Sequence, residues 1–476
     1  MQILKQLRAG PLIFFLAAGG LNHLAAQAQE PPLEMIGALS RAGIPLSSVG
    51  TYVQEVTGGK MLVASNATVA LNPASTMKLV TTNAALELLG PTFTWKTRAY
   101  VSGTQVGDVL NGDLIIKGGG DPKLVLENFW LFLRQARARG IREIRGNVLL
   151  DRSLFEEGFY DPAAFDGDPL KPYNAGPDAL LLNYKSFSYR FMPDEAGGKV
   201  KIVVDPPVAG YPITTPRLTN GECGDWKGKL QTAVSGSGVH FGGVYAASCG
   251  EKTWYVHPYQ MTHADYFNVV FRQLWADLGG SLKGEVKNGP VPPDARLVAE
   301  WESTTLPEVI RDINKYSNNV MARQLLLGLA ADIFKLPANP ERGGRAIKTW
   351  LANKGIDAPE LVIENGSGLS RIERISARTL GRMLVAAFYS PTMPEFMSSL
   401  PLAGYDGSMR QRVRNRGVAG NAHIKTGSLN DVRAIAGYVL AASGKRYVVV
   451  CIVNHRNAPA AQEAGDALLQ WVYEHG

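Results

Sequence analysis

The chain contains few cysteines and few histidines, and both scarcities limit the chemistry it can perform. Its 476 residues include three cysteines, Cys223, Cys249 and Cys451, and seven histidines. There is no His-Glu-x-x-His motif, and His257 and His263 have no cysteine or acidic partner at the spacing of metal ligands. We therefore expect neither a metal ion nor another cofactor.

The three cysteines predict one disulfide and one free thiol. In an oxidising compartment Cys223 and Cys249, which lie 26 positions apart in a glycine-rich region, are the reasonable pair. Closing a loop of this length would stabilise the fold by roughly 3 kcal/mol in the chain-entropy model. Cys451 lies in the apolar run 447–453, which favours a buried and unreactive thiol.

No hydrophobic run of membrane-spanning length occurs after the first residues of the chain. Residues 1–28 have a basic start with Lys5 and Arg8, then the apolar run 11–18, and small residues ending at Ala28. This pattern predicts a secretory signal peptide that is cut after Ala28 and an exported mature protein. An uncleaved membrane anchor is the alternative.

The chain also lacks a strong charge of either sign. Its formal net charge is +7 at pH 7, and loss of Lys5 and Arg8 with the signal peptide leaves 47 basic against 42 acidic residues. The one notable basic cluster comprises Arg134, Arg137, Arg139, Arg142 and Arg145. It has no interleaved aromatic residues, so we interpret it as a solvated face and expect no nucleic-acid partner. Peripheral association with a membrane or cell wall stays open, as does the oligomeric state.

Ser75 and Lys78 stand three residues apart where a helix is expected to begin. The apolar residues of 76–89 predict this helix, and Gly90 with the following proline ends it. Residues at this spacing share a helix face about 5–6 Å apart at Cβ, so Lys78 can reach the Ser75 hydroxyl. The helix start favours negative charge on Ser75 and a neutral amine at Lys78. The spacing alone is frequent by chance, and serine is a common N-cap.

Two further motifs could complete such a site. Ser317 and Asn319 lie in a break between two predicted helices, where an N-cap is the alternative interpretation. The third motif consists of Lys425, Thr426, Gly427 and Ser428. It ends a predicted strand on which Lys425 and Gly427 share a face, and the alternative is an edge strand protected by a lysine. His423 lies on the same face, where it could tune the site.

Together the three motifs are more specific than any one of them. Ser-x-x-Lys, Ser-x-Asn and Lys-Thr-Gly, in this order on a helix start, a loop and a strand, are the signature of penicillin-binding proteins and serine β-lactamases. Ser317 follows Lys78 at a distance of 239 positions, which indicates a large insertion. With segments such as 118–122 and 364–371, the chain resembles the D-alanyl-D-alanine carboxypeptidase/endopeptidase family, the low-molecular-mass class C penicillin-binding proteins among the serine penicillin-recognising enzymes.

The strand pattern and the resemblance together predict an α+β fold. Two strands near 49–65 and three strands within 422–453 would form one five-stranded antiparallel sheet flanked by helices, as in β-lactamase/transpeptidase-like domains. The predicted segments are a signal peptide (1–28), a discontinuous catalytic domain (29–97 and 298–476) and an inserted accessory region, partly β-rich (98–297).

The resemblance implies acyl transfer through a serine ester. Ser75 would be the nucleophile and Lys78 its base, Ser317 would relay a proton to the leaving amine, and Asn319 would hold a substrate amide and orient Lys78. The residues implied to bind the substrate are Lys425, Thr426, Gly427 and Ser428, of which Lys425, Thr426 and Ser428 would hold its terminal carboxylate. The backbone N–H groups of Ser75 and Ser428 would form the oxyanion hole.

The implied substrates are peptidoglycan peptides and their cross-links in the periplasm, with β-lactam antibiotics as covalent inhibitors. Whether carboxypeptidase or endopeptidase action dominates is left open by the sequence. Two alternatives also stay open: a β-lactamase or esterase, and a non-catalytic peptidoglycan-binding protein of the same fold.

Overall fold

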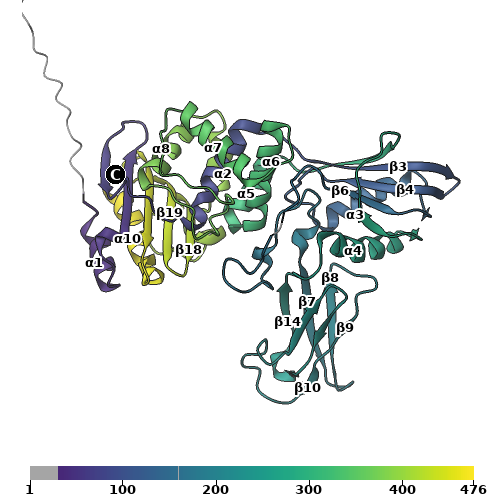
Figure 1. Cartoon of the computed structure of the whole chain (residues 1–476). Coiled ribbons are helices and arrows are strands. Elements are labelled where there is room, and N and C mark those ends of the chain that lie inside the picture. The colour runs from purple at the N-terminus through teal and green to yellow at the C-terminus, as the bar shows by residue number, and fades with distance from the viewer. Residues whose placement is uncertain (1–29, 159) are drawn as a thin grey trace, which may run out of the picture.

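The computed structural model describes residues 30–158 and 160–476. The predicted signal peptide, residues 1–28, lies outside the described residues. The described chain forms two parts (Figure 1). We call residues 30–95 and 303–476 the body, and residues 96–302 the insertion. No helix within these described ranges is long and apolar enough to cross a membrane.

The body is built on one five-stranded antiparallel sheet, and this confirms the predicted fold class. Its strands are β1 (Val49–Glu55), β2 (Met61–Ser65), β18 (Ala422–Leu429), β19 (Val432–Leu440) and β20 (Arg446–Asn454). The order is β18-β19-β20-β1-β2, so the two ends of the described chain meet where β20 pairs with β1. This pairing runs from Val49 opposite Val453 to Glu55 opposite Tyr447.

Helices cover both faces of this sheet. Successive side chains of a strand point to opposite faces, so the uninterrupted apolar run of β20 supplies two cores. Val448, Val450 and Ile452 face one core, while Val449 and Cys451 face the other. The second core is closed by α1 (Leu33–Arg41) and α10 (Gln462–His475). The first is formed with α2 (Met77–Leu89), α5 (Leu306–Tyr316), α6 (Asn319–Phe334), α7 (Pro340–Asn353), α8 (Ala377–Phe388) and α9 (Met393–Ser399).

The insertion begins and ends in one mixed sheet. Its strands are β3 (Lys96–Val106), β4 (Val109–Lys117), β5 (Glu143–Ile144), β6 (Val148–Asp151), β15 (Ser281–Leu282), β16 (Val286–Asn288) and β17 (Arg296–Glu302). Helices α3 (Leu126–Ala138) and α4 (His263–Asp277) pack against this sheet (Figure 1). The predicted domain boundaries, 97/98 and 297/298, fall inside the paired strands β3 and β17. The sequence could not place these boundaries at the strand ends, because an alternating pattern predicts a strand but not the sheet that the strand joins. The division into domains stays a prediction.

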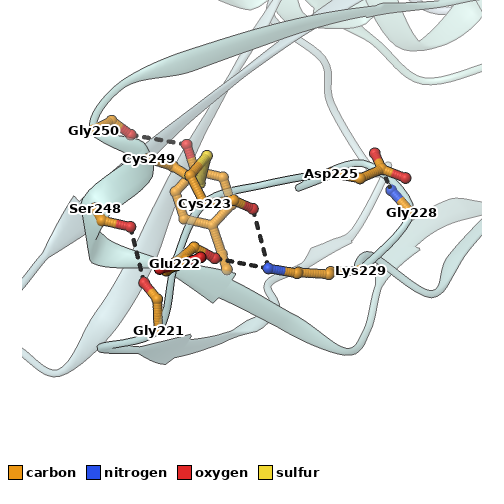
Figure 2. The surroundings of a disulfide bond; sticks show 10 residues. Gly221, Glu222, Cys223, Asp225, Gly228, Lys229, Ser248, Cys249 and Gly250 are labelled. Carbon is orange, nitrogen blue, oxygen red and sulfur yellow. Dashed lines mark hydrogen bonds between the residues drawn. A yellow bond between two sulfur atoms is a disulfide. The ribbon is translucent and has the colours of Figure 1, made fainter.

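The far end of the insertion consists of small β-sheets. One contains β7 (Phe187–Asp194), β8 (Lys199–Asp205) and β14 (Lys252–Val256), and a second contains β9 (Ile213–Thr214), β11 (Thr232–Ser235) and β12 (Gly238–Phe241). The third pairs β10 (Arg217–Thr219) with β13 (Val244–Ala246). A disulfide joins Cys223 to Cys249, as Figure 2 shows, and the ammonium of Lys229 donates to the carbonyls of Glu222 and Cys223 beside it.

Candidate active site

Ser75 lies in a 3₁₀ turn, Ala74–Thr76, that leads directly into α2. Its hydroxyl oxygen is 3.1 Å from Nζ of Lys78, which is in the first turn of that helix and is completely buried. Ala74 has a φ of 45°, a left-handed conformation that residues with a Cβ seldom adopt. Such backbone strain costs on the order of 1–3 kcal/mol and is found where a surrounding structure holds a functional residue in place.

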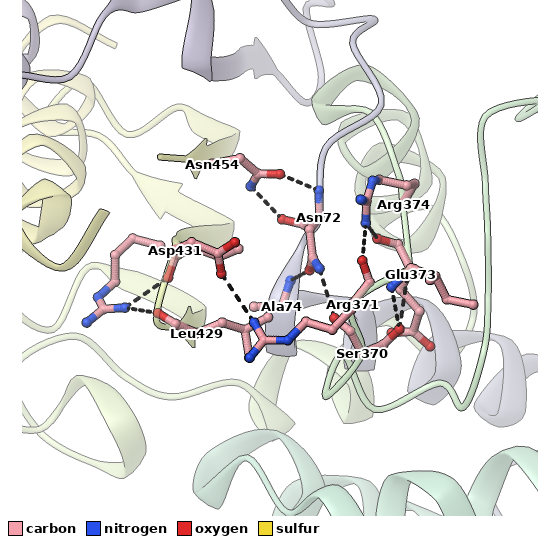
Figure 3. Close-up of polar contacts among 12 residues, drawn as sticks. Asn72, Ala74, Ser370, Arg371, Glu373, Arg374, Leu429, Asp431 and Asn454 are labelled. Atoms are coloured by element: carbon pink, nitrogen blue, oxygen red, sulfur yellow. Dashed lines mark hydrogen bonds and ion pairs between the residues drawn. The ribbon is translucent and has the colours of Figure 1, made fainter. Parts of the chain in front are cut away.

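Asn72 ties this turn to two distant parts of the body (Figure 3). Its side-chain oxygen accepts the backbone N–H of Ala74 at 2.9 Å, and its amide nitrogen donates to the carbonyl of Ser370 at 2.8 Å. Its backbone exchanges hydrogen bonds of 2.7 and 2.9 Å with the side chain of Asn454 at the end of β20. The strained turn is therefore held from both sides. Asn72 and Asn454 are 382 positions apart, and no motif in the sequence predicts a role for either.

The amine of Lys78 touches three oxygens. Besides Ser75, it lies 2.5 Å from Oδ1 of Asn319 and donates to the carbonyl of Ser367. Burial holds the pKa of Lys78 well below its ordinary value, and the charge of Lys425 lowers this pKa further. The motifs place two lysines in one site, but they give no sign of burial, which is the larger cause. The sequence also cannot predict the contact with Ser367, because every residue type has a backbone carbonyl.

The loop that presents the Ser367 carbonyl is organised by a buried carboxylate. Glu373 is fully buried, and its Oε1 accepts the backbone N–H groups of Glu364, Asn365 and Gly366 at 3.1, 3.0 and 2.8 Å. Burial raises the pKa of Glu373, and these three hydrogen bonds oppose the rise. The negative charge of Glu373 in turn raises the pKa of Lys78, against burial. Glu373 thus holds the loop and acts electrostatically on the amine.

Ser317 and Asn319 lie at the junction of α5 and α6. Ser317 ends α5 with a left-handed φ of 57°, and Asn319 is the first residue of α6. Asn318, between them, is the residue whose side chain caps α6. The N-cap interpretation therefore applies to Asn318 and leaves Ser317 available for another contact. That contact is with Lys425, whose ammonium donates to Oγ of Ser317 at 2.9 Å.

Lys425 lies on β18, which is an edge strand of the sheet. Its side chain nevertheless points inward: it is fully buried and also donates to the carbonyl of Thr426 at 2.8 Å. Burial lowers the pKa of Lys425 to about 7. A lysine that protects an edge would extend into water, so this interpretation does not fit. His423 is partly buried on the same strand, and burial lowers the pKa of its imidazole.

Gly427 lets β18 pass close to the turn that carries Ser75. A Cβ at this position would lie 2.7 Å from the carbonyl oxygen of Pro73 and 3.1 Å from the backbone nitrogen of Ser75. Both separations are too short for an unshifted side chain. The next residue, Ser428, is exposed, and Thr426 donates its hydroxyl to Oγ of Ser408 at 2.7 Å.

The fold thus gathers the residues of all three motifs. Lys78 contacts Ser75 and Asn319, Lys425 contacts Ser317, and the strand of Gly427 borders the Ser75 turn. No group of three or more His, Cys, Asp or Glu residues able to hold a metal ion occurs in 30–158 or 160–476. The arrangement can supply an activated hydroxyl and a second serine bonded to an ammonium, which are the elements of nucleophilic acyl transfer.

Comparison with known proteins agrees with this chemistry. The sequence profile described as the D-Ala-D-Ala carboxypeptidase 3 (S13) family matches residues 37–475. The chain belongs to this S13 family. It is therefore a hydrolase of the D-Ala-D-Ala carboxypeptidase kind, and the family predicted from the three motifs is confirmed.

Individual S13 relatives match along most of their length. D-alanyl-D-alanine carboxypeptidase DacB of Haemophilus influenzae is 26% identical over 425 residues, which cover 86% of this chain and 85% of the relative. The D-alanyl-D-alanine carboxypeptidase of Actinomadura sp. (strain R39) is 27% identical over 464 residues, 92% of this chain and 82% of the relative. The crystal structure of penicillin binding protein 4 from H. influenzae covers 93% of this chain and all of its own, with a TM-score of 0.79 at 23% identity. The likeness to that structure shows the same fold.

Proposed function

We propose that this S13-family protein is an exported, periplasmic serine carboxypeptidase that trims peptidoglycan stem peptides through an acyl-enzyme on Ser75. The observation that carries the proposal is the 3.1 Å contact between the partly exposed Ser75 hydroxyl and the buried amine of Lys78. The same site would cleave D-alanyl cross-links, which differ from the terminal peptide only in the group that leaves. We further assign residues 29–97 and 298–476 to a discontinuous catalytic domain and 98–297 to an accessory region.

The three oxygen contacts of Lys78 can serve an ammonium, which donates to all three, and they can also serve a neutral amine. A neutral amine has two N–H bonds and one lone pair, and two acceptors, Oδ1 of Asn319 and the carbonyl of Ser367, are in place for the N–H bonds. The lone pair is then directed to the hydroxyl of Ser75. Because burial and the charge of Lys425 lower the pKa of Lys78, its neutral form is easier to reach than that of an exposed lysine. This supports Lys78 as the general base.

The reaction proceeds in two acyl-transfer steps. Ser75 Oγ bonds to the carbonyl carbon between the two D-alanines while Lys78 takes the hydroxyl proton. The C–N bond then breaks, and the departing amine receives its proton through Ser317. Water next attacks the ester, which releases the shortened peptide as a carboxylic acid and restores the Ser75 hydroxyl. Backbone N–H groups of Ser75 and Ser428 stabilise the oxyanion, and loss of such a hole costs about 3–4 kcal/mol.

Substrate binding falls to the β18 strand and α6. Lys425, Thr426 and Ser428 would hold the terminal carboxylate, since they place an ammonium and two hydroxyls along one strand. Gly427 has no side chain to obstruct a substrate backbone. Asn319 would hold a substrate amide through its side-chain nitrogen, because its oxygen already contacts Lys78.

Covalent inhibition by β-lactams follows from the same nucleophile. A second crystal structure of H. influenzae penicillin binding protein 4 is a complex with a novel β-lactam. In this protein the β-lactam carbonyl would be attacked by Ser75, and the ring nitrogen would be the group that leaves.

Labelling with a penicillin tests the proposal. Intact-mass measurement should show one covalent adduct on the mature protein, and Ser75→Ala should abolish it. Ser237→Ala, at an exposed serine of the insertion, is the matched control and should label like the natural chain. An adduct of unchanged yield on Ser75→Ala would contradict the proposal.

Digestion of purified sacculi distinguishes carboxypeptidase from endopeptidase activity. Carboxypeptidase action releases D-alanine, whereas endopeptidase action converts cross-linked fragments into monomers. Sustained β-lactam hydrolysis without D-alanine release would indicate the β-lactamase or esterase alternative. Fragment binding without any covalent adduct would indicate a non-catalytic protein.

A further inference from the structure

A second polar cavity lies within the insertion, apart from the Ser75 site. It has a volume of about 450 Å³, and none of the residues of the three motifs lines it. Its polar lining includes Arg152, Asp178, Lys185, His257, His263 and Asn288. We call this cavity the Lys185 site.

Lys185 is a buried lysine on which the charges of Asp178 and Asp265 act, because they raise its pKa against the effect of burial. The residue is 6% exposed, and no hydrogen bond or ion pair within the described residues uses its ammonium. It ends three consecutive left-handed residues, Asn183, Tyr184 and Lys185, with φ values of 46°, 55° and 46°. A buried ammonium is costly unless it is paired, so an unfilled contact in a cavity indicates a missing anionic partner. Strained backbone at the same residue is typical of functional sites.

The two histidines of the cavity are neutral. Nδ1 of His257 donates to the carbonyl of Lys185 at 2.9 Å, which leaves its Nε2 unprotonated. Burial lowers the pKa of His257 to about 3 and that of His263 to about 4. Burial lowers the pKa of Lys185 only to about 8, so its ammonium is largely protonated at pH 7. Lys185, unlike the two histidines, is thus charged at pH 7, and unlike Arg152 it is not paired with Asp178.

The acidic groups around the cavity already have partners or lie in water. Asp178 accepts Nε of Arg152 at 2.7 Å and also the backbone N–H of Leu180. Glu156 accepts from Asn339 and Arg342, and Asp265 accepts from the Thr262 N-cap of α4. Glu157, at the mouth, is exposed. The charge of Lys185 is therefore left for a ligand, and the N-terminus of α4, at His263, adds a favourable dipole for an anion.

The cavity adjoins the active-site loop. Tyr160 and Pro162 line both the Lys185 site and a neighbouring cavity of about 200 Å³. The second cavity is also lined by Asn365 and Leu369, from the loop that offers the Ser367 carbonyl to Lys78. The shared residues Tyr160 and Pro162 thus link the Lys185 site to the loop that contacts Lys78.

We propose that the Lys185 site binds a carboxylate of peptidoglycan that lies outside the cleaved D-alanyl-D-alanine peptide. This inference rests on the proposed function, since it identifies a second contact for the same polymeric substrate. A carboxylate is the oxyanion that stem peptides carry, and a desolvated ammonium binds it with a strong, charge-assisted hydrogen bond. The site would favour polymeric or cross-linked substrate over a short peptide.

Substrates of two sizes test the proposal with the mature protein. We expect Lys185→Gln to raise KM about tenfold for a soluble peptidoglycan fragment with two stem peptides, the loss typical of one hydrogen bond to a charged group. The kcat/KM for a short peptide ending in D-Ala-D-Ala should not change. Lys185→Arg, which keeps the charge, should restore most of the fragment affinity. Lys199→Gln, at an exposed lysine of β8, is the control and should behave as the natural chain.

A binding measurement keeps the two proposals distinguishable. Calorimetric titration of the uncleaved fragment into Ser75→Ala should show an affinity that Lys185→Gln lowers about tenfold in the same background, whether or not the protein is an active peptidase. Equal affinity in both variants would overturn the Lys185 site.

An equal loss of activity on both substrates, with a lowered melting temperature, would show a structural role for Lys185 and would also overturn the proposal. If inorganic phosphate raises the melting temperature of the natural chain and Lys185→Gln leaves the KM for the fragment unchanged, the ligand of the Lys185 site is phosphate and not a peptidoglycan carboxylate. Absence of both a penicillin adduct and D-alanine release would overturn only the proposed function.

Discussion

Both parts of the molecule contain buried lysines, but the polar contacts of their side-chain amines differ. In the body, Lys78 and Lys425 each donate to or contact oxygens from distant segments of the chain. In the insertion, Lys185 has no such partner among the described residues, and its ammonium borders a cavity. The comparison shows that burial alone does not define a role for a lysine. We assign the two bonded lysines to the candidate active site, and we propose that a ligand would supply the contact that Lys185 lacks.

The two parts are also stabilised by different means. The body has a sheet whose central strand, β20, supplies apolar side chains to cores on both faces. The outer end of the insertion has small sheets held by aromatic packing, such as Tyr189 and Phe191 against Phe241 at ring separations of 5.0 Å, and by the disulfide. A sheet covered on both faces can hold groups from distant segments at fixed separations. We therefore expect the active site to respond sharply to small changes in the body and weakly to changes in the insertion.

Gly427→Ala should impair the active site most strongly. Its Cβ would meet the carbonyl of Pro73 at 2.7 Å and would push β18 away from the Ser75 turn. A misplacement of about 1 Å can reduce a rate by about 10²-fold, so we expect a loss of that order in the acylation rate by a labelled penicillin. Gly236→Ala, at an exposed glycine of the insertion with nothing nearer than 3.6 Å, is the control. Equal acylation rates for Gly427→Ala and Gly236→Ala would contradict the expectation that the active site is more sensitive to changes in the body than to changes in the insertion.

Glu373→Gln should have a smaller effect with a distinct pH signature. The neutral amide should accept the backbone N–H groups of the loop more weakly than the carboxylate does, so the Ser367 carbonyl would be held less firmly against Lys78. We expect acylation to slow by about tenfold, the effect of losing one or two hydrogen bonds. Acylation by the proposed route needs neutral Lys78, and the charge of Glu373 raises the pKa of Lys78. Removing that charge should lower this pKa and move the acid limb of the pH–rate profile to lower pH. Rates measured between pH 5 and 9 check this expectation, with Glu195→Gln, exposed in the insertion, as the control. A slower rate with an unmoved acid limb would leave Glu373 with a purely structural role.

Removal of the disulfide should have the smallest effect on the active site. Replacing Cys223 and Cys249 with serine should destabilise the insertion by roughly 3 kcal/mol, because the unfolded chain regains the entropy of a 26-residue loop. Chemical denaturation followed by tryptophan fluorescence measures this loss. The acylation rate of the folded variant should be unchanged. A large decrease in that rate would show that the two parts are more strongly coupled than the comparison suggests.

Much of the site can be predicted because its chemistry depends on residue type and order. Short motifs identify Ser75, Lys78, Ser317, Asn319 and Lys425, and the structure brings these residues together. The supporting groups cannot be identified in this way. Asn72 and Glu373 act on backbone N–H groups, and such contacts have no characteristic spacing in a sequence.

The sequence by itself determined the D-alanyl-D-alanine carboxypeptidase family and the five-stranded sheet assembled from both ends of the chain, and it supplied Ser75 and Lys78 as the candidate nucleophile and base. Motif order and strand periodicity are local properties, so they can be read without coordinates. Only the tertiary structure decided that burial is the main cause of the lowered pKa of Lys78, that Asn318 takes the N-cap role, and that Lys185 faces a cavity with no partner among the described residues. Each of these depends on which distant segments exclude water from a side chain, and that is decided when the chain packs.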